Sequence, residues 1–204
     1  MAEPLLRSGC FTGLTTNPTL LHAAGIRRHG LGEMIDWARA AGAKAVFLQS
    51  WGATQQELVS HAQELCALGG EVVIKVPATA VGITAAAALE AQGTPVLVTA
   101  VYNAAQCLPA MAVGASYVAP YLGRMNDAGR NGIQEIARMQ LSITAVGSGT
   151  RILVVSLRGP SDALTLAELG VRDLTFASAA WSAFFTDPLT DEAVDVFEQA
   201  SHAL

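Results

Sequence analysis

Charged residues, cysteines and long hydrophobic runs are all scarce in this sequence, and each shortage excludes a class of protein. Only 14% of the 204 residues are charged and 51% are hydrophobic, so a folded core is expected rather than a disordered chain. No apolar run approaches the roughly 20 residues that cross a membrane. No basic segment followed by a long apolar run begins the chain. We therefore expect a cytoplasmic protein with no membrane partner.

Basic residues and metal-binding patterns are scarce too. Twelve Lys and Arg against seventeen Asp and Glu leave a formal net charge of -5 without any basic block, which argues against nucleic acid as a partner. The three cysteines, Cys10, Cys66 and Cys107, lie far apart and suit reduced thiols. Neither a C-x-x-C nor an H-x-x-x-H pair occurs, so no metal site is predicted.

The sequence does contain a repeated alternation of short apolar runs with segments of helical composition. Its length fits one domain, residues 1–204. Runs rich in Val, Leu, Ile and Phe have the length of strands buried on both faces; they cover residues 11–16, 45–49, 72–76, 96–101, 117–121, 152–157 and 174–177. Helical segments are expected at 54–68, 82–91, 104–113, 133–144 and 161–169.

Several of the segments before a strand end in glycine, the residue that most readily adopts a left-handed backbone at a helix C-terminus; these are Gly42, Gly69, Gly93, Gly114 and Gly170. Repeated right-handed βαβ crossovers build either an open doubly wound sheet or a closed (β/α)8 barrel. No G-x-G-x-x-G follows a strand. We therefore predict an α/β fold of the TIM-barrel type that lacks one strand.

In such a barrel, residues at the carboxyl ends of the strands surround the mouth where chemistry occurs. Polar side chains follow or end six of the seven apolar runs: Thr15, Thr16 and Asn17, then Gln49, Lys75, Thr99, Tyr121 with Arg124, and Ser156 with Arg158. These residues are the candidates for a functional site.

Lys75 is the most unusual of them, because apolar residues flank it in the strand 72–76. Desolvation disfavours an ammonium group and lowers its pKa, and a partly neutral lysine is a nucleophile for carbonyl carbon. Alternatively, its stem lies in the core while its head reaches solvent or pairs with a carboxylate. No Asp or Glu ends a neighbouring strand, which favours the catalytic interpretation.

Six of the remaining candidates form two groups. Two guanidinium groups and a hydroxyl, from Arg124, Arg158 and Ser156, could clamp a phosphate dianion, or could be ordinary surface charge on βα loops. Tyr121, Gln49 and Thr99 could hold a water or donate a proton near the lysine, or could be buried polar groups with structural partners.

Four motifs occur in order along the chain, and together they resemble one family. They are Thr15-Thr16-Asn17-Pro18, Ile74-Lys75-Val76-Pro77-Ala78-Thr79 followed by Gly82, Thr99-Ala100-Val101-Tyr102, and Tyr117-Val118-Ala119-Pro120-Tyr121 with Arg124. The chain resembles the transaldolase family, most closely its small fructose-6-phosphate aldolase-like branch. The likeness runs from about residue 10 to the C-terminus.

This resemblance implies a class I mechanism that needs no cofactor and no metal, with Lys75 as the Schiff-base lysine. Tyr121, with Gln49 and Thr99 holding a water, matches the proton-transfer group of the aldolase-like branch. Asn17 and Thr15 or Thr16 match the donor-binding loop. Arg124, Ser156 and Arg158 match the phosphate-binding positions, and the Ser-x-Arg spacing is that of true transaldolases.

One feature of the family is missing. Its members ordinarily begin with a strand that ends in Leu-Asp-Thr and brings an aspartate into the active site, whereas residues 1–9 here have the pattern of the helix that follows it. An N-terminal truncation would explain both the missing strand and the missing carboxylate. We expect imine formation to survive this loss better than turnover.

Three functions remain open at this point. The first is an aldolase that joins or cleaves a dihydroxyacetone-type donor and an aldehyde or sugar-phosphate acceptor. The second is a transaldolase that moves the same unit between sugar phosphates, and the third is a non-catalytic phosphosugar-binding homologue.

The C-terminal segment 191–203 is amphipathic, with Val194 and Phe197 on one face. It either covers its own barrel or docks on a neighbouring subunit. Members of the family that the chain resembles are commonly pentamers or decamers held by this helix, so a homo-oligomer is expected.

Overall fold

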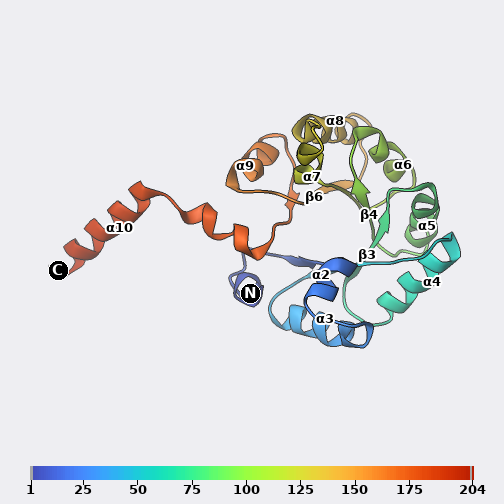
Figure 1. The fold of residues 1–204 in the computed structure, drawn as a ribbon, viewed down its shortest axis with the longest axis horizontal. Coiled ribbons are helices and arrows are strands. Elements are labelled where there is room, and N and C mark those ends of the chain that lie inside the picture. The colour runs from blue at the N-terminus through green and yellow to red at the C-terminus, as the bar shows by residue number, and fades with distance from the viewer. Residues whose placement is uncertain (1, 203) are drawn as a thin grey trace.

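A computed structural model describes residues 2–202 and 204, and within this range seven strands form one parallel sheet. The strands pair in sequence order, as consecutive right-handed βαβ units require. They are β1 (Gly13–Thr15), β2 (Ala45–Gln49), β3 (Val72–Pro77), β4 (Val96–Val101), β5 (Tyr117–Pro120), β6 (Arg151–Val154) and β7 (Asp173–Leu174). The sheet curls into a barrel that is open on one side (Figure 1).

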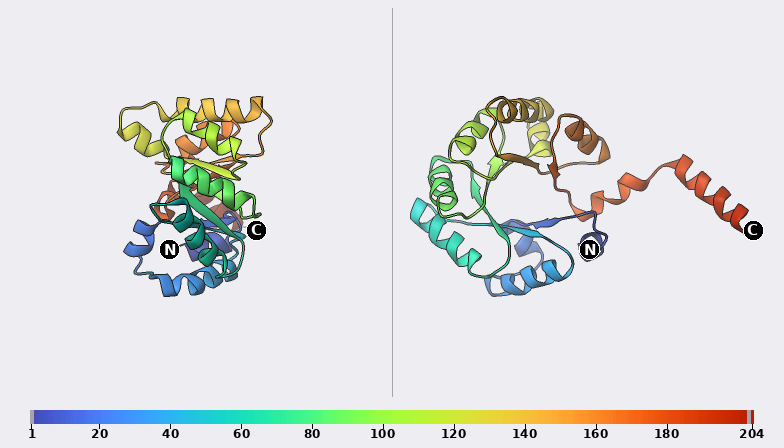
Figure 2. Two further views of the ribbon diagram at one scale, coloured as in Figure 1. Left: turned by 90° about the vertical axis from the view of Figure 1, so that its right-hand side faces the viewer. Right: turned by 180° about the vertical axis from the view of Figure 1, so that it is seen from behind.

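Most of the helices lie on the outside of this curled sheet, and the last one stands away from it (Figure 2). The helices are α1 (Glu3–Arg7), α2 (Pro18–Ala23), α3 (Leu31–Ala40), α4 (Gln55–Cys66), α5 (Ala80–Glu90), α6 (Cys107–Ala112), α7 (Leu122–Asp127), α8 (Gly132–Ala145), α9 (Pro160–Glu168) and α10 (Pro188–Ser201). The predicted parallel α/β barrel lacking one strand is confirmed.

Local signals in the sequence explain where many helices begin and end. α4 begins with a capping box, in which the Thr54 side chain accepts from the Glu57 N–H and the Glu57 carboxylate accepts from the Thr54 N–H. Gly93 and Gly114 follow α5 and α6 with φ of 78° and 72°, and this left-handed backbone turns the chain back toward the sheet.

The two faces of the sheet carry different apolar layers because side chains alternate along each strand. One face packs on the helices and forms the main core, with Val46, Ile74, Val98 and Val154 among its members. The inner face carries a second, smaller cluster that fills the barrel; its buried members are Phe47, Val73, Leu97, Ala119 and Leu153.

The barrel is open between β1 and β7. Among the described residues, no strand pairs with the outer edge of either one. The two edges meet through a hydrogen bond of 2.9 Å between the hydroxyls of Thr15 and Thr175. A cavity of about 710 Å³ lies along this seam, lined by residues of both edges such as Leu14 and Leu174. The gap leaves backbone hydrogen-bonding groups unpaired, which is a cost that closed barrels avoid.

Several element boundaries differ from the sequence prediction. The sixth strand ends at Val154 instead of continuing to Leu157, because Ser156 has a positive φ of 64° that takes the chain out of the strand. The segment predicted as one helix at 104–113 is a 3-10 turn (Ala104–Gln106) followed by α6. The short helix α7 was not predicted.

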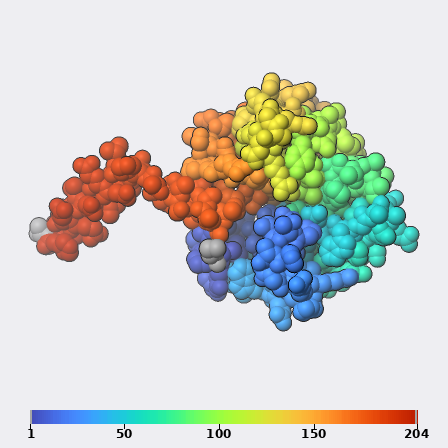
Figure 3. Space-filling view, in the orientation of Figure 1, coloured from blue at the N-terminus to red at the C-terminus, as the bar shows by residue number. Residues whose placement is uncertain are grey.

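The C-terminal helix α10 stands away from the barrel on an extended arm (Figures 1 and 3). No residue between Pro188 and Ser201 is buried, and the apolar side chains of Leu189 and Phe197 are 75% and 69% exposed. The alternative that this helix covers its own barrel is therefore wrong. Met1, in the predicted helical segment 1–9, and Ala203, in the predicted amphipathic segment 191–203, lie outside the described residues.

None of the described helices is both long enough and apolar enough to cross a membrane.

Candidate active site

A ring of polar side chains lies on the inner face of the barrel, directly above the inner apolar cluster. Each of these residues stands two positions further along its strand than a member of that cluster, so both point to the same side. The pairs are Phe47 and Gln49, Val73 and Lys75, Leu97 and Thr99, and Ala119 and Tyr121. The alternation thus brings four predicted site residues together at the carboxyl ends of β2 to β5.

Lys75 is the one charged residue among the four of this ring, and 5% of its surface is exposed. Its Nζ donates a hydrogen bond of 2.5 Å to the backbone oxygen of Thr16. None of the ion pairs among the described residues involves it. Desolvation by burial therefore acts uncompensated by a carboxylate and lowers the pKa of Lys75 from 10.5 to about 8.

Thr99 and Tyr121 contact each other in this ring, with 3.2 Å between the threonine Oγ1 and the tyrosine hydroxyl. Thr99 is 2% exposed and Tyr121 is half-buried. Ala100, the next residue of β4, has a positive φ of 58°, and the pairing of β4 with β5 shifts register there. Thr99 faces the interior by the regular alternation, and the irregularity after it turns Val101 toward the main core, where Val101 pairs with Pro120.

Gln49 lies beside the lysine. It is the register partner of Lys75 in the pairing of β2 with β3, and its side chain is half-buried.

The loop after β1 contributes backbone more than side chains. The Thr16 hydroxyl donates to the backbone oxygen of Phe47 at 2.8 Å, and the Asn17 side chain accepts from Leu20 as the N-cap of α2. Thr15 faces the seam, where it contacts Thr175. The Thr16 carbonyl is therefore the part of this loop that reaches Lys75.

Arg124 lies in α7, at the edge of the ring. Its Nη1 donates to the Tyr102 hydroxyl at 3.4 Å, and its guanidinium lies 4.9 Å from the centre of the Tyr121 ring. This hydrogen bond to the Tyr102 hydroxyl raises the pKa of Arg124, so the side chain stays charged. Tyr102 had no assigned role in the sequence analysis; its position one residue after β4 was the available signal.

Ser156 and Arg158 lie beside α7 because a glycine allows close approach. A Cβ added at Gly123 would lie 2.4 Å from the Ser156 backbone oxygen and 2.8 Å from Arg158 Nε. The Gly123 N–H donates to this same oxygen at 3.0 Å. Gly123 therefore allows the start of α7 to lie close to the polar residues that follow β6. Arg124 is the next residue of this helix.

Arg158 is also paired with a carboxylate that the sequence analysis did not single out. Its guanidinium donates to Asp127, the last residue of α7, and its backbone N–H donates to Asp162 at 2.8 Å. Within the described residues no group of His, Cys, Asp or Glu side chains could hold a metal ion.

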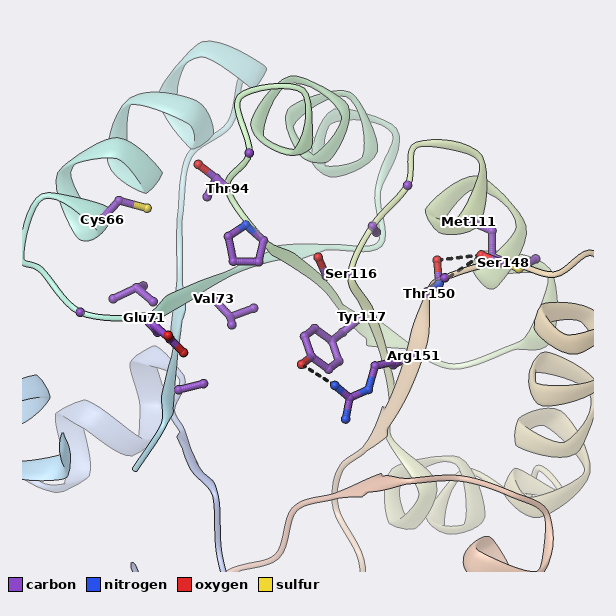
Figure 4. A pocket seen from close by; sticks show the side chains of 18 residues that line it. Cys66, Glu71, Val73, Thr94, Met111, Ser116, Tyr117, Ser148, Thr150 and Arg151 are labelled. Atoms are coloured by element: carbon purple, nitrogen blue, oxygen red, sulfur yellow. Dashed lines mark hydrogen bonds between the residues drawn. The ribbon is translucent and has the colours of Figure 1, made fainter. Parts of the chain in front are cut away.

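A larger cavity, of about 970 Å³, opens at the other end of the barrel. It is lined by loops that precede the strands, and Arg151 donates to the Tyr117 hydroxyl within it at 3.2 Å (Figure 4). It contains none of the four residues of the polar ring. Chemistry in this fold class occurs at the carboxyl ends of the strands, so the cavity is not the candidate site.

Comparison with known families and sequences gives consistent matches. The model of the family described as transaldolase/fructose-6-phosphate aldolase matches residues 2–204. A probable transaldolase of Streptococcus agalactiae serotype V is 31% identical over 193 residues, covering 95% of this chain and 88% of the relative. A probable transaldolase of Coprothermobacter proteolyticus is 33% identical over 189 residues, covering 93% and 86%.

Solved structures with similar folds share little sequence. The flavin-binding domain of baker's yeast flavocytochrome b2 superposes with a TM-score of 0.60 at 13% identity, covering 84% of this chain and 51% of that one. A dihydrodipicolinate synthase family protein from Coccidioides immitis gives 0.58 at 16% identity, covering 84% and 56%. The chain thus spans about half the length of these two structures, and the likeness concerns the fold alone.

Proposed function

This chain belongs to the transaldolase/fructose-6-phosphate aldolase family, and we propose that it is a class I aldolase in which Lys75 forms a Schiff base with a dihydroxyacetone-type donor. The observation that carries this proposal is the burial of Lys75 without a carboxylate partner, which lowers its pKa to about 8. An appreciable neutral fraction is then present near pH 7 to 8, as a nucleophilic amine requires.

In the proposed reaction, neutral Nζ attacks the donor's ketone carbon, and loss of one water from the carbinolamine leaves an iminium ion. For cleavage, a base removes the proton of the hydroxyl on the far carbon of the breaking bond, which is the carbon that becomes the aldehyde. The bonding electrons then move toward the iminium nitrogen, which gives an enamine and frees the aldehyde. Protonation of the enamine and hydrolysis of the imine release the ketone and regenerate Lys75.

We propose that Tyr121 and Thr99 carry out the proton transfers of this reaction. Their hydroxyls lie 3.2 Å apart on the strands that follow the one carrying Lys75. Gln49, the strand neighbour of Lys75, would complete the site for a water. A positioned proton donor of this kind typically accelerates a reaction by about 10² to 10⁴.

A phosphate group on the substrate would bind between β6 and α7. Ser156 and Arg158 lie against Gly123 there, and Arg124 is the next residue of α7. Two guanidinium groups with a hydroxyl match the charge and acceptors of a phosphate dianion. On the donor side, the Thr16 backbone oxygen contacts Lys75, and we propose that its neighbours Thr15 and Asn17 help to bind the donor.

A transaldolase is the second candidate. It is favoured by the Ser156-x-Arg158 spacing and by the names of the relatives, whereas Gln49 and Tyr121 favour the aldolase. The two differ in whether the enamine is protonated and released or attacks a second aldehyde.

Product analysis separates these candidates. Fructose 6-phosphate is incubated with the protein with and without an acceptor aldehyde, and both the consumption of fructose 6-phosphate and the release of free dihydroxyacetone are measured. Release without acceptor supports the aldolase, and conversion only when acceptor is present supports the transaldolase. No conversion in either case, with retained binding of sugar phosphate, would leave the non-catalytic binding function.

We also propose a cytoplasmic homo-oligomer. The three cysteines are all unpaired, which suits a reducing compartment. The exposed apolar residues of α10 lie on an arm that its own barrel does not cover, so a second copy is the proposed partner.

A further inference from the structure

The two arginines of the proposed phosphate site have different partners. Arg124 donates to the neutral hydroxyl of Tyr102, and no described carboxylate pairs with it. Arg158 forms an ion pair with Asp127. One of the two guanidinium groups is therefore ready to receive an anion, while the other already holds one from the protein itself.

The position of Asp127 is not explained by the stability of its own helix. It is the last residue of α7, and a negative charge at a helix C-terminus meets the negative end of the helix dipole. Both side chains of the pair are 64% exposed, where ion pairs contribute little to folding. What the pair does change is the availability of Arg158.

We propose that Asp127 is a specificity-determining residue that competes with the phosphate group of the substrate for Arg158. This inference rests on the proposed function of Arg124, Ser156 and Arg158. A phosphate dianion that takes the Arg158 guanidinium must displace the Asp127 carboxylate and remain close to it. An aldehyde without a phosphate group meets neither obstacle. Asp127 therefore reduces the difference in affinity by which the site prefers phosphorylated acceptors over unphosphorylated ones.

The test compares glyceraldehyde 3-phosphate with glyceraldehyde as acceptors. Asp127→Asn should lower KM for the phosphorylated aldehyde by about three- to tenfold, the combined effect of one exposed ion pair and one nearby like charge. KM for glyceraldehyde should stay within about a factor of two. Glu168→Gln is the matched control. Glu168 is likewise an acidic residue that ends a helix, but it lies at the end of α9 that is remote from Arg158, so its loss should change neither KM.

A double-mutant cycle ties the effect to its partner. In the Arg158→Gln background, Asp127→Asn should improve KM for the phosphorylated aldehyde clearly less than in the native background, because the contested guanidinium is absent and only the repulsion between Asp127 and the phosphate remains to be relieved. Isothermal titration with inorganic phosphate gives the same comparison without turnover.

The outcomes separate the inference from its premise. If Arg158→Gln weakens neither phosphate binding nor KM for the phosphorylated aldehyde, the phosphate site itself is wrong. If Arg158→Gln weakens both and Asp127→Asn has no effect, competition by Asp127 is refuted alone. A weaker affinity in Asp127→Asn would also overturn it, since Asp127 would then orient Arg158 for the phosphate.

Discussion

At the scale of single residues, the burial of Lys75 is both the basis of its proposed reactivity and a cost to folding. Its amine sits against the Thr16 carbonyl in a ring whose other members are neutral. The inner-face alternation that places it there could be predicted from the sequence, since Val73 and Lys75 are two residues apart in one apolar run. Tyr102 and Asp127 could not be found in this way, because a loop and an unpredicted helix carry them.

Lys75→Met should make the protein more stable at pH 7, by at most about 3 kcal/mol. The folded pKa is about 8 and the ordinary value is 10.5, so the unfolded chain binds the proton more tightly and the native chain gains stability as pH rises between these values. The advantage of Lys75→Met should therefore be largest below pH 8 and shrink toward pH 10.5. Urea denaturation across this range measures it. Lys44→Met, at an exposed lysine, should show no such trend.

At the scale of elements, apolar composition predicted the interior strands well and their ends less well. β2 and β4 have the predicted bounds because most residues of each strand are buried, on both faces of the sheet. β6 is shorter than predicted because contacts distant in sequence decide where it ends. The chain turns at Ser156, and the backbone oxygens of Val155 and Ser156 accept hydrogen bonds from the first residues of α7.

Gly123→Ala should weaken this junction. Its new Cβ would overlap the Ser156 backbone oxygen, so α7 or the end of β6 must shift, and a loss of about 1 to 3 kcal/mol is expected. Binding of phosphorylated substrate should weaken along with stability. Gly32→Ala is a close control, because Gly32 is likewise the second residue of its helix and nothing lies within 4 Å of the added Cβ. It should stabilise the protein by about 0.5 to 1 kcal/mol in the same thermal or urea melts; equal effects of the two changes would refute the argument.

At the scale of the whole molecule, two surfaces lack partners in the described chain, namely the seam between β1 and β7 and the apolar face of α10. The sequence predicted the missing strand from the number of apolar runs. It left the placement of α10 open, because an amphipathic pattern does not say which surface the apolar face contacts.

The arm should hold the oligomer together. Replacing both Leu189 and Phe197 by Ser should reduce the mass in solution toward that of one chain, because the apolar contact between copies would lose its largest side chains. Light scattering after gel filtration measures this mass. Leu141→Ser changes an equally exposed leucine on α8, 70% exposed, and should leave the mass unchanged. An unchanged mass in the arm variant would exclude α10 as the interface.

The most direct test of the account is borohydride trapping, read by intact mass. The chain contains only two lysines, Lys44 and Lys75, so the position of an adduct is readily assigned. With dihydroxyacetone or fructose 6-phosphate, we predict one donor-sized adduct on the native chain and on Lys44→Ala, and none on Lys75→Ala. Its yield should rise with pH through about 8, as Lys75 loses its proton, and imine should form even where turnover is slow. Absence of an adduct on the native chain, or its persistence on Lys75→Ala, would contradict Schiff-base catalysis by Lys75.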